Sequence, residues 1–422
     1  MSQLKRSEFV KNVLTLLTGT ALGQVIALVL SVIVTRIYDP EMFASLEHFA
    51  MFIGILGVIA GGKYEAAIML PKTEEEAKHL LALTLRIGLF SGIGLTAVFF
   101  LLSDGIGNLI GNEDIKPYLW LVGPTVFFFV VRTAMGYWFS RQKNYKPASA
   151  AKVFFSAVSE PLKIGAGAAG IKPGGLIYGV VGGHLVAASF LWWRFKQQVA
   201  DGFKGVTKAQ RAEQGKVFSD YPRYSILGSL LNRLAQWLHI ALFGLLFGEA
   251  GLIAVGFMGL SRRIVLAPMN MLATSFSQVY FQRLTEIPDG SQLRSFYLTS
   301  LKRFSVFALF VIAVIWILPD QTTTWIFGEE WDGVMRYLRI LVFWFACNFA
   351  VASLGFVLHR IRKQKQMLGL DAFHFFIVLS GLLIAYYSGL DAFGALTYFV
   401  IAKVIYFIVN VIVTLQLLKK EA

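Results

Sequence analysis

The sequence has little of what disulfide-bonded, metal-binding and nucleotide-binding proteins use. Its 422 residues include a single cysteine, Cys347, which excludes an internal disulfide. Its six histidines show none of the spacings of metal ligands. No Walker-type glycine-rich loop is present to hold a nucleotide. We therefore expect no metal, no cofactor and no ATP hydrolysis on this chain.

Charged residues are also scarce, at 15% of the chain, whereas 56% of the residues are hydrophobic and the mean hydropathy is +0.63. Soluble domains are roughly 45–50% apolar. Many apolar windows are long enough to cross the hydrocarbon core, which takes about 20 helical residues. The sequence therefore predicts an all-α polytopic membrane protein.

We expect about 12 transmembrane helices. Their expected ranges are 13–35, 43–61, 80–102, 119–139, 153–171, 174–193, 224–247, 251–280, 303–318, 338–358, 368–388 and 394–416. The longest polar, basic connection falls near mid-chain. It predicts an N-terminal six-helix lobe at 1–200, a cytoplasmic linker at 201–223 and a C-terminal six-helix lobe at 224–422. Two parallel repeats of this kind typically rock about a central cavity.

Basic residues orient the predicted helices. The side opposite the N-terminus has few of them, namely Arg36, Lys116, Lys172 and Arg336, while every connection on the N-terminal side carries several. Cytoplasmic loops accumulate Lys and Arg, so both termini are expected to be cytoplasmic. This rule also accounts for the net charge of +14, and we expect no nucleic-acid partner.

Several cations fall inside the expected membrane-spanning ranges. Each costs about 2.5–3.5 kcal/mol at a helix centre by insertion scales, so we expect them to face a protein interior or a watery cavity. Because the cations outnumber the buried anions, we interpret the cavity as a site for an anionic substrate. The substrate-binding candidates are Arg132, Arg233, Arg262 and Lys403. Adjacent helical residues point about 100° apart, and we favour Arg262 over Arg263.

A second site is predicted at Glu160-Pro161-Leu162-Lys163. Glu160 and Lys163 are three residues apart and share one helix face. Pro161 lacks an N–H and is expected to break the helix. A broken helix with a carboxylate is a candidate site for H⁺ or Na⁺ coupling or gating. The alternative is a structural pair that closes a kink.

One motif carries a family resemblance. Residues 62–72, Gly-Lys-Tyr-Glu-Ala-Ala-Ile-Met-Leu-Pro-Lys, resemble the Arg-Tyr-Glu-x-Ala-Ile-x-Leu-Pro element after the second helix of bacterial polysaccharide flippases. These are the Wzx-type, polysaccharide-transport members of the MOP exporter superfamily. Residues 261–268 with 277–280 look like the eighth helix of that family. Lys63 stands where arginine is common.

This resemblance implies a flippase for undecaprenyl-diphosphate-linked oligosaccharide in the bacterial inner membrane, as in O-antigen, capsule or exopolysaccharide synthesis. Its two lobes would alternate between inward- and outward-facing states around a cationic cavity. Lys63 would receive the diphosphate at the cytoplasmic entrance, and Glu65 would orient Lys63 or take up a coupling cation. Further partners would be membrane lipids and the polymerase and chain-length proteins of the same pathway.

Three alternatives stay open. A small-molecule or drug exporter of the same superfamily would call for acidic midplane sites. A membrane glycan polymerase or ligase needs a large outer loop, whereas the outer connections at 103–118 and 319–337 are short and mainly acidic. A lipid II flippase usually has more membrane spans. We therefore expect a transporter and not an enzyme.

Overall fold

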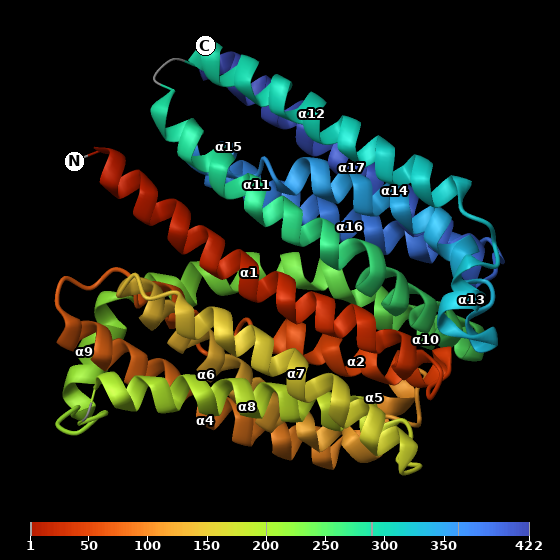
Figure 1. The fold of residues 1–422 in the computed structure, drawn as a ribbon, viewed down its shortest axis with the longest axis horizontal. Helices are drawn as coiled ribbons and strands as arrows, with labels where there is room; N and C mark the ends of the chain where they lie inside the picture. Colours follow the sequence, from red (N-terminus) through yellow and green to blue (C-terminus); the bar gives the residue numbers. More distant parts are fainter. Residues whose placement is uncertain (1, 200, 288–289, 362, 422) are drawn as a thin grey trace. The chain divides into compact units, whose positions relative to one another are not determined.

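The computed structural model describes residues 2–199, 201–287, 290–361 and 363–421 (Figure 1). Within these ranges the chain is 84% helix and contains no strand. The all-α class predicted from the sequence is therefore confirmed. The terminal residues Met1 and Ala422, on which part of the predicted orientation depends, lie outside the described residues.

Contacts divide the chain into two compact units, one formed by residues 1–38 with 42–241 and the other by 39–41 with 242–422. The division falls inside the long helix Ile226–Ser261, whereas the sequence predicts a linker at 201–223. That linker region contains a helix of its own, α9 (Lys208–Val217), which starts with a capping box between Thr207 and Gln210. The lobe boundaries expected from the sequence stay a prediction.

The first unit is built from helices α1 to α9 and the start of α10. Their bounds are α1 (Ser2–Thr35), α2 (Pro40–Leu56), α3 (Tyr64–Ala67), α4 (Glu74–Leu101), α5 (Ser103–Leu109), η1 (Lys116–Leu121), α6 (Val122–Arg141), α7 (Lys146–Ala168), α8 (Gly174–Gln198), α9 (Lys208–Val217), η2 (Tyr221–Ser225) and α10 (Ile226–Ser261). α7 packs against α1 and α8, and α6 packs against α4 and α8.

The second unit contains the end of α10 and all later helices. Their bounds are η3 (Arg262–Leu266), α11 (Ala267–Glu286), α12 (Gly290–Ile317), α13 (Thr322–Phe327), η4 (Glu329–Trp331), α14 (Val334–Ala352), α15 (Phe356–Arg360), α16 (Gln364–Tyr387) and α17 (Ala392–Glu421). Here α14 packs against α12 and α17, and α16 packs against α17.

Nine helices in the described ranges are long and apolar enough to cross a membrane. α2 and α7 are not among them, since α2 has only 17 residues and α7 carries charged side chains. The run 226–274 counts once, although α10 bends at Gly248, whose φ of 55° and ψ of −133° are not helical. A bend there agrees with the expected boundary between the spans at 224–247 and 251–280, but the count of twelve stays a prediction.

Small residues let the helices of the first unit approach closely, as is common in membrane proteins. Gly167 on α7 and Gly175 on α8 both face the ring of Tyr38. The Tyr38 hydroxyl donates a hydrogen bond of 2.8 Å to the carbonyl oxygen of Lys163. Tyr38 is 1% exposed, so the ring is enclosed by protein and cannot swing out into solvent.

We predict that Gly175→Ala destabilises the protein by about 1–3 kcal/mol, because the added methyl group overpacks the site. Its Cβ would collide with the Tyr38 hydroxyl and lie 2.9 Å from the Cβ of Ala166. Thermal unfolding of the purified protein measures the change. Gly165→Ala on α7 is the matched control, because its Cβ meets no atom within 4 Å, and it should leave stability unchanged or raise it. Equal melting temperatures for both variants would contradict the packing described.

Candidate functional site

The motif at residues 62–72 forms a tight turn followed by the short helix α3. Gly62 and Lys63 have φ values of 68° and 63°, so two successive residues are left-handed. A non-glycine residue in that region is strained by about 1–2 kcal/mol. The turn leaves Lys63 partly exposed and buries Glu65, which is 8% exposed. Strained backbone of this kind is concentrated at functional sites.

Three predicted site residues in the first unit influence one another electrostatically. Burial lowers the pKa of Lys63, Glu65 opposes that shift, and Arg233 adds to it. Burial raises the pKa of Glu65, and its own backbone and Lys63 act in the opposite direction. Within the described part of the chain, the Glu65 Oε2 atom is buried without a hydrogen-bond partner. The motif therefore places a poorly solvated carboxyl group near the Lys63 ammonium, which in turn lies within electrostatic range of Arg233.

Arg132 lines a polar pocket of about 470 Å³ in the first unit. The pocket is lined by Arg132, Thr133, Gly136, Tyr137 and Ser140 from α6, by Ala148, Ala151 and Lys152 from α7, and by Leu191 from α8. Two cations and three hydroxyl groups, with no carboxylate among the described lining residues, give the pocket the chemistry of an anion site.

Aromatic rings and one hydroxyl group position the two cations of this pocket. The Arg132 guanidinium lies 5.4 Å from the ring centroid of Phe155 and 5.6 Å from that of Phe129. Lys152 donates a hydrogen bond of 2.8 Å to the Thr20 hydroxyl on α1. Sequence reasoning missed Lys152, because its position near the start of α7 made it look like one of the basic residues of a cytoplasmic connection.

Tyr137 connects the pocket to the motif. Its side chain lines the pocket and lies within electrostatic range of Glu65 and Tyr221. The first unit therefore brings Lys63, Glu65 and Arg233 together at one position and Arg132 at another, with Tyr137 near both. No single stretch of sequence contains this arrangement, because α6, α7 and the motif are separated along the chain.

Glu160 and Lys163 form the expected pair on α7. The distance from Lys163 Nζ to Glu160 Oε1 is 2.8 Å, and the side chains are 2% and 3% exposed. The expected break at Pro161 is wrong, because α7 continues from Lys146 to Ala168. Pro161 removes only one backbone hydrogen bond from the helix. The packing of α7 against α1 and α8 offsets that loss, so the helix continues.

Lys403 in the second unit is 1% exposed. Its Nζ lies 2.9 Å from His374 Nε2, and the His374 ring stacks on Tyr406 with centroids 3.9 Å apart. Arg262, in the π-helical turn η3, is within electrostatic range of Lys403. The second unit thus brings together Arg262 and Lys403. His374 was missed, because it lies on α16 and Lys403 on α17.

A second missed residue is Arg141, at the end of α6. Its Nη1 donates to the carbonyl oxygen of Met69 at 3.1 Å. Its Nη2 donates to those of Pro71 at 2.6 Å and Thr73 at 3.2 Å. One guanidinium therefore anchors the end of the motif and the start of α4. The sequence showed Arg141 only as one more positive charge at a membrane boundary.

Comparison with known proteins decides the family. A family model described as polysaccharide biosynthesis protein matches residues 13–336. The chain belongs to this family. None of the curated proteins matches the chain. The family resemblance found in the sequence is therefore confirmed.

Solved structures show that its fold is that of MOP superfamily transporters. A multidrug resistance MATE family transporter in an inward-facing conformation has a TM-score of 0.76 at 18% identity, with 96% of each chain covered. The outward-facing conformation of a MATE family transporter gives 0.63 at 17%, covering 98% of this chain and 96% of the other. A MOP transporter from Pyrococcus furiosus gives the same values. At these identities the likeness shows the fold alone. Together with the nine described helices that are long and apolar enough to cross a membrane, this fold supports a multi-pass membrane protein.

We predict that Arg141→Ala loosens the segment from Met69 to Thr73. Hydrogen bonds to charged groups are worth about 1.5–3 kcal/mol each, so losing the Arg141 guanidinium should give about tenfold faster tryptic cleavage after Lys72. Limited proteolysis of the purified protein with mass spectrometry measures the rate at this one bond. Lys146→Ala, a nearby exposed cation, is the control and should cleave like the wild type. An unchanged rate in Arg141→Ala would show that this segment does not depend on the guanidinium.

Proposed function

We propose that this protein is a flippase that moves undecaprenyl-diphosphate-linked oligosaccharide repeat units across the bacterial inner membrane by alternating access. The direction is from the cytoplasmic to the outer leaflet, with both termini in the cytoplasm and an H⁺ or Na⁺ gradient as the energy source. Membership of the polysaccharide biosynthesis family supports a saccharide substrate. The MOP transporter fold supports transport over enzymatic synthesis.

The observation that carries the proposal is the cationic pocket on α6 and α7. Arginine and lysine both bind phosphate oxygens. Arg132 and Lys152 line this pocket together with the hydroxyl groups of Thr133, Tyr137 and Ser140, which are suited to phosphate and sugar oxygens. We assign the pocket to the diphosphate headgroup when the first unit holds substrate. Further substrate contacts are assigned to Lys63 and Arg233 in that unit, and to Arg262 and Lys403 in the second unit.

The competing function is export of a small molecule, since similar structures include multidrug resistance transporters. The fold does not select between the two. The Pyrococcus furiosus transporter is itself described as having a binding pocket of reverse polarity that suggests a different function. An exporter of cationic drugs would need carboxylates, whereas the described residues of the pocket on α6 supply two cations. This charge favours an anionic substrate.

We predict that the purified protein equilibrates undecaprenyl-diphosphate oligosaccharide between the leaflets of proteoliposomes. Accessibility of the sugar to an external glycosidase measures crossing. The Arg132→Gln/Lys152→Gln variant should flip at least about tenfold more slowly, because it loses charge-assisted contacts to phosphate. Arg233→Ala and Arg262→Ala should abolish flipping while the protein stays in the membrane.

Lys116→Gln is the control for these variants, because Lys116 pairs with Glu113 and lies outside the pocket. Normal flipping by the double glutamine variant would remove the pocket on α6 from the mechanism. If nothing crosses with a panel of oligosaccharides and an imposed ion gradient, the small-molecule exporter becomes the preferred function.

We also predict that the buried pair on α7 takes part in ion coupling. Removing one partner of a buried ion pair is strongly destabilising, so the test uses Glu160→Gln together with Lys163→Met, which leaves no charge behind. In proteoliposomes this variant should retain flipping and lose its response to imposed H⁺ and Na⁺ gradients. A response equal to that of the wild type would make Glu160 and Lys163 a purely structural pair.

A further inference from the structure

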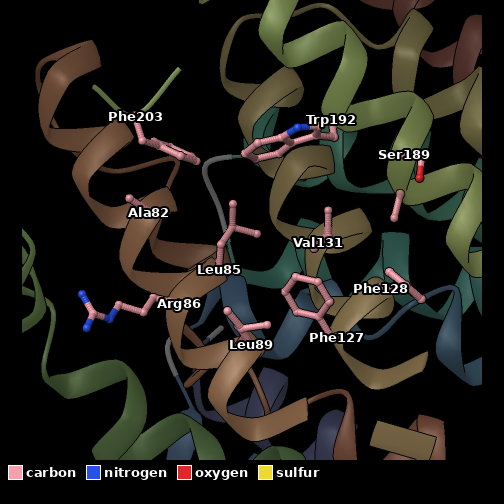
Figure 2. Close-up of a pocket in the computed structure, with 11 residues that line it drawn as sticks. Ala82, Leu85, Arg86, Leu89, Phe127, Phe128, Val131, Ser189, Trp192 and Phe203 are labelled. Carbon is pink, nitrogen blue, oxygen red and sulfur yellow. The ribbon is translucent and has the colours of Figure 1, made fainter. Parts of the chain in front are cut away.

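A second pocket of about 460 Å³ lies on the other side of α6, within the first unit (Figure 2). Its volume is within the roughly 300–1,000 Å³ of ligand pockets. The lining is almost entirely apolar. It includes Ala82, Arg86 and Leu89 from α4, Val131 from α6, Trp192 from α8, and Phe203. Val131 lines this pocket and the neighbouring Arg132 lines the cationic one, so α6 separates two pockets of opposite character.

Exposed apolar side chains lie on α4 at Leu89, which lines the apolar pocket, and at the neighbouring Phe90 and Ile93. Leu89, Phe90 and Ile93 on α4 are 44%, 60% and 57% exposed, and α4 is one of the helices that can cross the membrane. Large apolar side chains exposed on such a helix lie against lipid tails. A lipid chain therefore reaches this pocket from the bilayer, without passing through water.

One end of the pocket is closed by two aromatic rings. Phe203, from the connection between α8 and α9, lies beside Trp192 at one end of the pocket in Figure 2, with ring centroids 5.8 Å apart. The Lys196 ammonium lies 5.9 Å from the Trp192 ring. Tryptophan with nearby cations is typical of the level of lipid headgroups, so this end of the pocket lies near the membrane surface.

Arg86 supplies the charge. It lies about three turns into α4, and its guanidinium is 5.6 Å from the Phe90 ring. In Figure 2 its side chain is at the edge of the pocket and points away from the aromatic rings. No ion pair joins Arg86 to a carboxylate in the described part of the chain. Charges inside the membrane are costly and normally paired, and Arg86 is exposed, so its guanidinium is available to an anion from outside the protein.

We infer that this pocket binds one anionic phospholipid of the surrounding bilayer, with an acyl chain between α4, α6 and α8 and the phosphate at Arg86. The tail of the proposed substrate is a less suitable occupant, since the wall of α6 separates this pocket from the cationic one. The inference is independent of flipping, because lipid retention is measured without transport.

Native mass spectrometry of the full-length protein tests the site. The probes are dioleoyl-phosphatidylglycerol and dioleoyl-phosphatidylcholine, which share their acyl chains. We expect the wild type to retain the anionic lipid about fivefold more than the zwitterionic lipid, as follows from one cation near lipid phosphate. Arg86→Gln should remove this preference. Arg194→Gln is the matched control, because Arg194 lies 5.7 Å from the Trp193 ring and outside the pocket, and it should keep the preference.

A second variant tests the acyl chain. Ala82→Phe fills the pocket and should reduce retention of both lipids, while Arg86→Gln keeps the test decisive if Ala82→Phe does not fold. A preference that persists in Arg86→Gln overturns the inference. Displacement of phosphatidylglycerol by equimolar undecaprenyl phosphate also overturns the inference, because the pocket would then be a polyprenyl site. Displacement by inorganic phosphate alone overturns it too, because the acyl chain would then play no role.

Discussion

The cost of placing a charge in a low-dielectric interior is the constraint on which the arrangement of this protein depends. Three cations of the described structure show the surroundings that such charges need. Lys163 pairs with Glu160, Arg132 lies near two aromatic rings, and Lys403 contacts His374. These partners come from neighbouring turns and neighbouring helices. The contacts that stabilise each charge are therefore also contacts that pack the helices together. A substitution in either partner changes both.

The helix α6 shows how this constraint produces two environments from one element. Arg132 and the hydroxyl groups of Thr133, Tyr137 and Ser140 line a pocket with Lys152, whereas Phe127, Phe128 and Val131 line an apolar pocket. Helical periodicity turns successive residues toward different neighbours. A polar ligand and a lipid chain can therefore both contact α6 without meeting. Arg141, at the end of the same helix, anchors the motif that carries the family resemblance.

The fold alone leaves the ligand undecided. Transporters similar to this chain include a multidrug resistance protein and one whose pocket is described as having reverse polarity. Function is determined by the residues of a site and not by the fold that carries it. In the first unit those residues supply positive charge and hydroxyl groups. This chemistry, together with the family, is the reason for proposing an anionic, sugar-bearing lipid as the substrate.

The sequence alone determined the properties that depend on local composition and period. Apolar length predicted the membrane-spanning class, a spacing of three predicted the Glu160–Lys163 pair, and the motif with Lys63 and Glu65 indicated the family. These signals are local, because a helix repeats every 3.6 residues and a membrane span needs a fixed length. The cost of a buried charge likewise marked Arg132 and Lys403 as residues that need special surroundings.

Only the tertiary structure decided which groups meet. Lys152 lines the same pocket as Arg132, and His374 contacts Lys403. Arg141 donates hydrogen bonds to carbonyl oxygens about 70 residues away along the chain. Tertiary packing also keeps α7 helical through Pro161, where the missing N–H of proline alone predicted a break. These contacts join different helices, and their geometry depends on how side chains from several helices fill shared space. That packing is a property of the whole unit, so no spacing within the sequence encodes it.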